Sequence, residues 1–333
     1  MPRIVRYYRF GDPEELVLEE AAPAAPGLGE VRLGVLAIGI NNSEAQLRRG
    51  TYPLLDPEFP TRIGKEAHGI IEALGPGVDG FAVGERVSTI PMFDMARYGV
   101  YGEWAIVPAE SLVRMPVGLG AVKSAAVWQA YLTAYGPFVA YSDPAPGSWA
   151  LITAASSSVG FAALQTAKAR GMKAIGTTRR RDKAAGLAAA GFDRVVVTGE
   201  EPLAATVMEA TGGAGAAIVF DPISGPIVAE LAEAAAPGAT IFEYGALAAE
   251  PTPYPLVTCL KKGLGIRGFT LWEIVRDPGR LADGKRFVVE RLESGVFDPV
   301  VDRVFGLDEI AAAHRYLEAA RHSGKIVVKV RDE

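Results

Sequence analysis

Short apolar segments separated by Gly/Pro turns dominate the first third of the chain. They predict strands at 31–40, 69–74, 85–90 and 103–107. The turn-rich run APAAPGLGE precedes the first strand and GPGVDG follows the second. Many short strands with frequent turns are typical of a barrel-like or sandwich domain. The N-terminal part is therefore predicted to be β-rich.

The middle of the chain changes its hydrophobic period. Buried-type strands are predicted at 149–153, 173–177, 194–197, 216–220 and 240–244. Amphipathic helices are predicted between them at 159–170, 181–190, 203–210 and 226–235. Strands that alternate with helices pair in parallel, with crossover helices on both faces of the sheet. The pattern predicts a doubly wound parallel-sheet domain over 122–295.

The tail returns to mixed structure. A helix is predicted over 307–320, with Asp308 as its N-cap, and a last strand over 325–330. The last strand, which follows the parallel-sheet domain in the chain, could pair with a strand of the N-terminal domain. We therefore predict a discontinuous first domain, made of residues 1–121 and 296–333.

Composition narrows the function classes. Of 333 residues, 49% are hydrophobic and 22% charged, an ordinary globular balance for about two domains. The net charge of −5 offers no bulk attraction for nucleic acid. No apolar run approaches the roughly 18 residues of a membrane span, and the first fifteen residues lack the apolar core of a signal peptide. We predict a cytoplasmic protein with no membrane or nucleic-acid partner.

Cysteine and histidine are scarce. The single cysteine, Cys259, cannot form an internal disulfide. The three histidines are scattered, so the usual Cys/His zinc sites are disfavoured. His68 is predicted to be packed or hydrogen-bonded, and His314 to lie at the surface of the last helix.

One strand–turn–helix segment, 149–171, is a candidate phosphate site. Helix N-terminal N–H groups and the helix dipole attract anions. Ser156, Ser157 and Ser158 stand where glycines are usual in such a turn, and Gly160 remains. Serine is small and its hydroxyl can donate to phosphate. An ordinary turn with a serine cap is the alternative.

The end of the next predicted strand bears on cofactor choice. An acidic residue there binds the 2′-hydroxyl of NAD, whereas arginine accommodates the 2′-phosphate of NADP. This strand ends in TTRRR, 177–181, and the first acid, Asp182, comes late. Arg179 and Arg180, with support from Lys183, therefore favour NADP. A solvated charge run or a nucleic-acid patch is the alternative.

Several separated motifs agree along the whole chain. They are GINNSEAQLRRGTYP at 39–53, IGKEAHGIIEALGPGVDGFAVGERV at 63–87, AASSSVG at 154–160 and GKIVVKV at 324–330. In this order the chain resembles the medium-chain dehydrogenase/reductase superfamily, specifically its zinc-free quinone oxidoreductase and enoyl reductase branch. The resemblance implies an α/β protein with a GroES-like β-rich catalytic domain and a Rossmann domain.

The same resemblance bears on the metal. Zinc-dependent relatives carry ligands at positions where this chain has Asn41, Lys65 and Gln129. Three residues that do not ligate zinc there argue against a catalytic zinc. Zinc would polarise an unactivated carbonyl. Without it we expect a quinone, enone or enal, which accepts hydride at its β-carbon while charge spreads onto oxygen.

The resemblance also implies catalytic candidates. Tyr52 is the candidate proton donor, since a phenol of pKa near roughly 10 can protonate an enolate. Asn41 would donate to the substrate carbonyl or the nicotinamide ribose, and Gln129 would orient the nicotinamide. The alternatives are a Tyr52 that only anchors its turn and an Asn41 that makes only a local hydrogen bond. Lys65 is either a cation beside the developing oxyanion or a structural ion-pair partner of a neighbouring glutamate, Glu44 or Glu66.

The implied cofactor is NADPH. Its predicted binding residues are Thr133, Ser156, Ser157, Ser158, Val159, Gly160, Thr177, Arg179, Arg180, Lys183, Tyr244, Gly245, Ala246, Phe269, Thr270, Leu271 and Lys325.

Three functions stay open. The first is an NADPH-dependent reductase of quinones or α,β-unsaturated carbonyls, and the second is an enoyl reductase acting on an acyl or polyketide intermediate. The third is an NADPH-binding sensor or RNA-binding protein with little turnover. Relatives often dimerise through the edge of the Rossmann sheet, so we also expect a homodimer, with 237–254 as the candidate edge.

Overall fold

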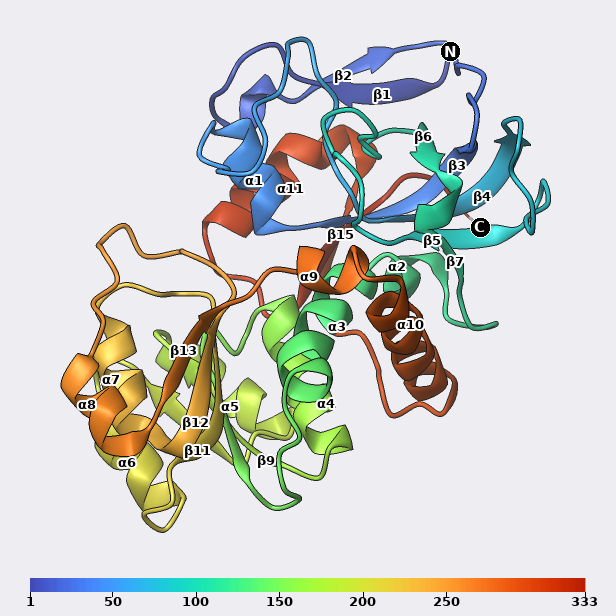
Figure 1. Ribbon diagram of the computed structural model, residues 1–333. Coiled ribbons are helices and arrows are strands. Elements are labelled where there is room, and N and C mark those ends of the chain that lie inside the picture. The colour runs from blue at the N-terminus through green and yellow to red at the C-terminus, as the bar shows by residue number, and fades with distance from the viewer. Residues whose placement is uncertain (333) are drawn as a thin grey trace. The chain divides into compact units, whose positions relative to one another are not determined.

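The computed structural model describes residues 1–332, which divide into two compact units. Unit 1 comprises Met1–Gln129 together with the tail from Asp298, and unit 2 comprises Ala130–Phe297. Figure 1 shows both units with most of their helices and strands labelled. The β-rich and parallel-sheet parts of the predicted fold class are both confirmed.

Unit 1 is built on a mainly antiparallel sheet of order β14-β15-β3-β4-β5-β7, with β6 also paired to β3. The strands are β3 (Glu30–Ile40), β4 (Ala67–Leu74), β5 (Arg86–Thr89), β6 (Trp104–Pro108), β7 (Leu112–Arg114), β14 (Val301–Gly306) and β15 (Lys325–Lys329). A separate hairpin joins β1 (Arg3–Arg6) to β2 (Val17–Glu20). The helices are α1 (Asn42–Arg48), α2 (Ala121–Ser124) and α11 (Ile310–Glu318), with short 3-10 turns η1 (Pro13–Glu15), η2 (Ala109–Ser111) and η4 (Leu307–Glu309).

The last strand of the chain lies beside one of the first. β15 pairs antiparallel with β3, with Ile326 opposite Ile40 and Val328 opposite Ile38. β3 is apolar and almost wholly buried, because it is covered on both faces and flanked by neighbours along both edges. The register brings Lys325, at the start of β15, to the place where β3 ends and α1 begins.

Unit 2 is built on a parallel sheet of order β10-β9-β8-β11-β12-β13. The strands are β8 (Trp149–Ile152), β9 (Lys173–Thr178), β10 (Arg194–Val197), β11 (Ala216–Asp221), β12 (Ala235–Glu243) and β13 (Gly265–Gly268). The helices between them are α4 (Ser158–Ala169), α5 (Arg181–Ala189), α6 (Leu203–Ala210), α7 (Ile227–Ala234) and α8 (Leu256–Lys262). The remaining elements are α3 (Trp128–Tyr135), the π-helical turn η3 (Gly136–Ala140), α9 (Trp272–Val275) and α10 (Pro278–Glu293). The order reverses between β8 and β11, as in a doubly wound sheet.

Several elements differ from the sequence-based prediction. The predicted helix at 307–320 is a 3-10 turn followed by α11, and Asp308 is not its N-cap. Instead the Glu309 carboxylate accepts a hydrogen bond from the Gly306 N–H at 2.8 Å. The prediction also missed α10, although Asp277 caps it and Pro278 occupies its first position, the usual start signal of a helix.

Within residues 1–332, every helix is too short or too polar to cross a bilayer.

Candidate functional site

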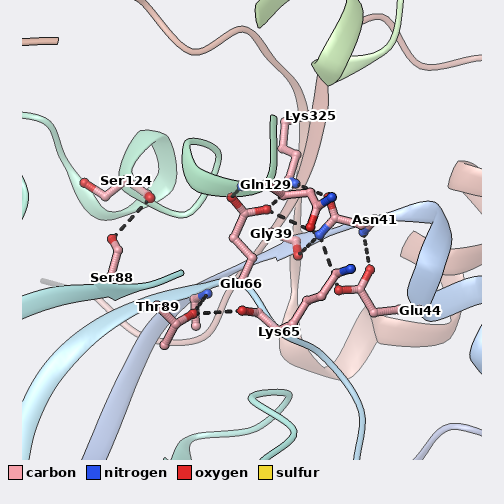
Figure 2. Close-up of polar contacts among 11 residues, drawn as sticks. Gly39, Asn41, Glu44, Lys65, Glu66, Ser88, Thr89, Ser124, Gln129 and Lys325 are labelled. Carbon is pink, nitrogen blue, oxygen red and sulfur yellow. Dashed lines mark hydrogen bonds and ion pairs between the residues drawn. The ribbon is translucent and has the colours of Figure 1, made fainter. Parts of the chain in front are cut away.

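A buried polar cluster lies in unit 1 where three strand ends meet. β3 ends just before Asn41, Lys65 and Glu66 directly precede β4, and Lys325 begins β15. Glu44 joins them from the first turn of α1. Figure 2 shows these side chains pointing toward one another. Residues far apart in the chain therefore form one site because β15 and β4 both pair with β3.

An ion pair forms the centre of this cluster. The Lys325 amino group donates to Glu66 Oε2 at 2.5 Å and to Asn41 Oδ1 at 2.6 Å. Glu66 Oε1 accepts the Gln129 backbone N–H at 3.0 Å. Both charged side chains are buried, with relative exposures of 1% for Lys325 and 0% for Glu66. The hydrogen bonds to Asn41 and from the Gln129 N–H help to stabilise this ion pair, because burying two charges carries a large desolvation penalty.

Asn41 is tied to its own surroundings. Its side-chain amide nitrogen lies 3.3 Å from oxygen atoms of Gly39, Glu44 and Glu66. Its backbone N–H donates to Glu44 Oε2 at 2.6 Å, which closes a capping box at the start of α1. The amide group would have to give up one of these partners to donate to a substrate. The arrangement therefore favours the local alternative for Asn41.

Lys65 differs from its neighbours. Its amino group makes no hydrogen bond or ion pair with the described residues, and its side chain extends toward Glu44 (Figure 2). Burial lowers the pKa of Lys65, and the nearby Glu44 and Glu66 oppose that effect. Burial raises the pKa of Glu44, opposed first by Lys65. Both pKa shifts favour the neutral forms of the pair, so the Lys65 ammonium is a better proton donor than an exposed lysine.

Tyr52 follows α1 in a segment without regular secondary structure. It is partly buried and packs against the main core of unit 1. This packing is compatible with both roles considered for Tyr52.

The predictions for His68 and His314, both in unit 1, have contrasting outcomes. His68 is buried and its Nδ1 lies 2.9 Å from Ser88 Oγ, so the predicted packed histidine is confirmed. The surface prediction for His314 is wrong: it is fully buried, with Nε2 3.3 Å from the Tyr101 hydroxyl. Burial lowers its pKa to about 3. The signal was present, because His314 lies one turn after the buried Ile310 on the apolar face of α11.

In unit 2, the turn from β8 to α4 is tightly packed. Ser157 is the N-cap of α4, and its hydroxyl accepts the Gly160 N–H at 3.0 Å. A Cβ on Gly160 would lie 2.5 Å from the Ala155 carbonyl oxygen, so only glycine fits. The Lys183 amino group donates to Ser156 Oγ at 3.1 Å. The serines, Val159 and Lys183 thus lie around the positive end of a three-turn helix.

The arginines after β9 separate into paired and unpaired side chains. Arg180 donates to Asp182 at 3.0 Å, and Arg181 pairs with Glu200. Arg179 is exposed and makes no hydrogen bond or ion pair with residues 1–332. Arg179 is therefore free to meet an added anion without breaking an existing contact.

The other predicted cofactor residues lie at several places. In unit 2, Thr177 is the last but one residue of β9 and its carbonyl accepts the Ala155 N–H at 3.0 Å, while Thr133 is buried on α3. The Tyr244 ring stacks on Phe220 at 4.0 Å between centroids, directly after β12. The remaining ones in unit 2 are Gly245 and Ala246 after Tyr244, the buried Phe269, the exposed Thr270, and Leu271 at the start of α9. Lys325 alone belongs to unit 1, inside the buried ion pair.

Two protein families match the chain. Residues 27–117 match the family described as "Alcohol dehydrogenase GroES-like domain", and residues 158–281 match "Zinc-binding dehydrogenase". Among residues 1–332, no group of three or more His, Cys, Asp or Glu side chains is arranged to hold a metal ion.

Known proteins match over nearly the full length. The chain is 30% identical to the 2-haloacrylate reductase of a Burkholderia species, over 96% of this chain and 97% of that protein. Its fold matches a crystal structure of an NAD-dependent alcohol dehydrogenase with a TM-score of 0.89 and 30% identity, covering 99% and 100% of the two chains. It also matches Escherichia coli quinone oxidoreductase complexed with NADPH, with a TM-score of 0.88, 26% identity and coverage of 98% and 99%.

The class of protein follows from these observations. A GroES-like β-rich unit and a doubly wound parallel-sheet unit with a phosphate-type turn define a two-domain oxidoreductase. The chain belongs to the medium-chain dehydrogenase/reductase superfamily.

The buried ion pair generates a stability prediction. Lys325→Met should destabilise unit 1 by about 3–5 kcal/mol, because it leaves the Glu66 charge buried without its partner. The double variant Lys325→Met/Glu66→Gln should lose less, since the orphaned charge is gone. Hydrogen exchange of peptides from β3 and β15 reports unit 1 separately from unit 2.

Lys123→Met is the matched control in the same unit. The Lys123–Asp298 pair is about half exposed, so its loss should change stability by less than about 1 kcal/mol. A Lys325→Met effect as small as that of the control would show that the buried pair does not hold β15 in place.

Proposed function

We propose that this protein is an NADPH-dependent reductase of quinones or α,β-unsaturated carbonyl compounds that works without zinc. The observation that carries the proposal is Lys65. A partly buried, proton-donating amine stands in the polar cluster of unit 1, at a position where the family resemblance places a zinc ligand. A cation there can stabilise developing negative charge on a carbonyl oxygen, which is the electrostatic task that zinc performs in metal-dependent relatives.

The residues of unit 2 fit a dinucleotide. The N-terminus of α4, with Gly160 and the surrounding serines, offers backbone N–H groups and hydroxyls to a pyrophosphate. The unpaired Arg179 after β9 suits the 2′-phosphate of NADPH. When bound, NADPH supplies the hydride. Because one similar structure is named NAD-dependent and another holds NADPH, the preference for NADPH rests on Arg179.

The chemistry assigned to the chain is charge stabilisation and proton supply. As hydride reaches the β-carbon of an activated alkene, negative charge develops on the carbonyl oxygen. Lys65, as an ammonium, stabilises that oxygen and holds a transferable proton at Nζ. Glu44 offsets part of the lowering of the Lys65 pKa that burial causes. The name of the 2-haloacrylate reductase denotes an activated alkene as substrate, which supports this substrate class.

We further propose that a second copy of the chain covers the outer edge of unit 2. β13 is the edge strand of the sheet, and exposed apolar side chains gather before and on the adjoining α8. Tyr254 is 64% exposed and Leu260 74% exposed, with Leu256 and Val257 beside them. Apolar side chains clustered at an unpaired sheet edge are typical of an interface.

Cofactor choice is tested with Arg179→Ala. NADPH should bind wild type more tightly than NADH, and the variant should lose at least about tenfold in NADPH affinity with NADH affinity unchanged. Arg181→Ala is the control, because Arg181 already pairs with Glu200. Equal NADPH and NADH affinities in both wild type and Arg179→Ala would contradict the assignment.

The same titrations are combined with an assay of NADPH oxidation in the presence of quinones, enals and enoyl thioesters. Tight NADPH binding without oxidation by any acceptor would point to a sensor.

The proton donor is identified from variants and pH profiles. Lys65→Met should lower kcat by about 10²-fold or more, whereas Tyr52→Phe should change it little. The donor is the ammonium form, so wild-type activity falls as pH rises through the lowered pKa of Lys65. Lys65→Arg should move that falling limb to higher pH, because guanidinium stays protonated. A large loss in Tyr52→Phe with Lys65→Met intact would assign the proton to Tyr52 instead.

The edge interface is tested by sedimentation velocity. Wild type should sediment as a dimer, and Leu260→Asp should shift it to monomer, because a buried carboxylate is costly. Val117→Asp, which changes an exposed apolar residue in unit 1, should leave the dimer intact. A monomeric wild type would refute the interface.

A further inference from the structure

Two carboxyl groups lie side by side in unit 2, at the ends of adjacent parallel strands. The register of β11 and β12 pairs Asp221 with Glu243. Asp221 is fully buried: one of its oxygens accepts from the Thr153 hydroxyl, and the other accepts the Ser224 N–H at 2.6 Å. Asp221 is thus held by two donors, whereas Glu243 has a different set of neighbours.

The contacts of the Ser224 hydroxyl bear on the protonation state of Glu243. The Ser224 hydroxyl oxygen lies 2.6 Å from Glu243 Oε2 and 2.8 Å from the Gly245 carbonyl oxygen. A hydroxyl has one proton, and a carbonyl oxygen can only accept. Because the hydroxyl has a single proton, Ser224 gives the Gly245 carbonyl its full hydrogen bond only when Glu243 is protonated and donates to the Ser224 oxygen. The contacts of Ser224 therefore favour a protonated Glu243.

The surrounding groups favour the same state. The charged group facing Glu243 from β11 is Asp221, while its partner on β13 is Gly268, which has no side chain. The nearby cation on β13, Arg267, is bound to Glu273. Burial, followed by the charge of Asp221, raises the pKa of Glu243 to about 8, and a hydrogen bond from Ser224 opposes this rise.

Ser224 holds a backbone conformation that needs support. Its φ of 58° lies in the left-handed region, which is unfavourable for residues other than glycine. Its N–H and hydroxyl contacts to Asp221, Glu243 and Gly245 keep it there. Such strain persists only where the surrounding contacts over-determine it.

We infer that the proton on Glu243 positions the segment Tyr244–Ala246 through Ser224, and so sets how well that segment receives the cofactor. The inference rests on the proposed function, in which these residues line the NADPH site. Ser224 connects Glu243 to the segment, because its hydroxyl accepts a hydrogen bond from protonated Glu243 and donates one to the Gly245 carbonyl. Glu243 is a positioning residue, since it acts through Ser224 and not by contact with the cofactor.

Loss of this proton changes the hydrogen bonds in a defined way. An ionised Glu243 accepts the single Ser224 proton, so the Gly245 carbonyl loses its donor. The new charge also faces Asp221, which adds like-charge repulsion at the strand ends. Backbone bonds from Tyr244 to Asp221 and from Leu247 to Pro222 remain, so the segment loosens without detaching. NADPH affinity should then fall as pH rises through the pKa of Glu243.

The proton itself is read by infrared spectroscopy of the cofactor-free protein. Wild type near pH 7 should show the C=O stretch of a protonated carboxylic acid, which disappears on raising the pH to about 9. Glu243→Gln should lack this band, and the exposed-acid control Glu230→Gln should keep it. Absence of the band in wild type would overturn the inference, whatever the protein does with NADPH.

Its effect is read from NADPH dissociation constants at about pH 7 and about pH 9. Between these values, wild type and Glu230→Gln should weaken about fivefold more than Glu243→Gln, the effect of losing one hydrogen bond. Glutamine stays neutral and can donate to Ser224 at both pH values. The same pH dependence in wild type and Glu243→Gln would overturn the positioning role. Failure to bind NADPH at either pH would refute the proposed function instead, while the infrared result still reports the proton.

Discussion

The pairing of Lys325 with Glu66 is the interaction on which unit 1 depends. It joins the last strand of the chain to the loop before β4 and orients Asn41 between them. The ion pair also depends on the absence of a side chain at Gly39. A Cβ on Gly39 would lie 2.0 Å from the Ala125 carbonyl oxygen and 2.8 Å from Lys325 Cε, so the glycine lets the lysine reach its acid. The pair, the glycine and the β3–β15 register therefore require one another.

The long-range Lys325–Glu66 contact explains which parts of the structure could be predicted from the sequence and which could not. The strand–helix alternation of unit 2 is local, and β10 (Arg194–Val197) and α6 (Leu203–Ala210) match their predicted bounds. The buried cluster is not local: Lys325 meets Glu66 across 259 positions of the chain. No periodicity encodes such a contact, and the family resemblance implies only a cofactor-binding role for Lys325. Its hydrogen-bond partners became visible only once β15 was placed beside β3.

The structure also separates residues that the sequence left equivalent. Three consecutive arginines follow β9, and charge alone cannot rank them. Arg180 and Arg181 are occupied by Asp182 and Glu200, which leaves Arg179 for an external anion. Asn41 and Lys65 differ in the same respect, namely whether the side chain already has hydrogen-bond partners. The amide is used by Gly39, Glu44 and Glu66, while the amine has no hydrogen-bond partner among the described residues.

Burial acts on both units by one physical rule, with opposite results for acids and bases. It lowers the pKa of Lys65 and raises that of Glu243, because each site disfavours an isolated charge. For an amine this makes the proton easier to give up, and for a carboxyl it makes the proton harder to lose. The proton that we propose Lys65 transfers and the proton that we propose Glu243 retains thus depend on the same desolvation. The difference between a donor and a positioning group follows from which residue type the fold buries at each strand end.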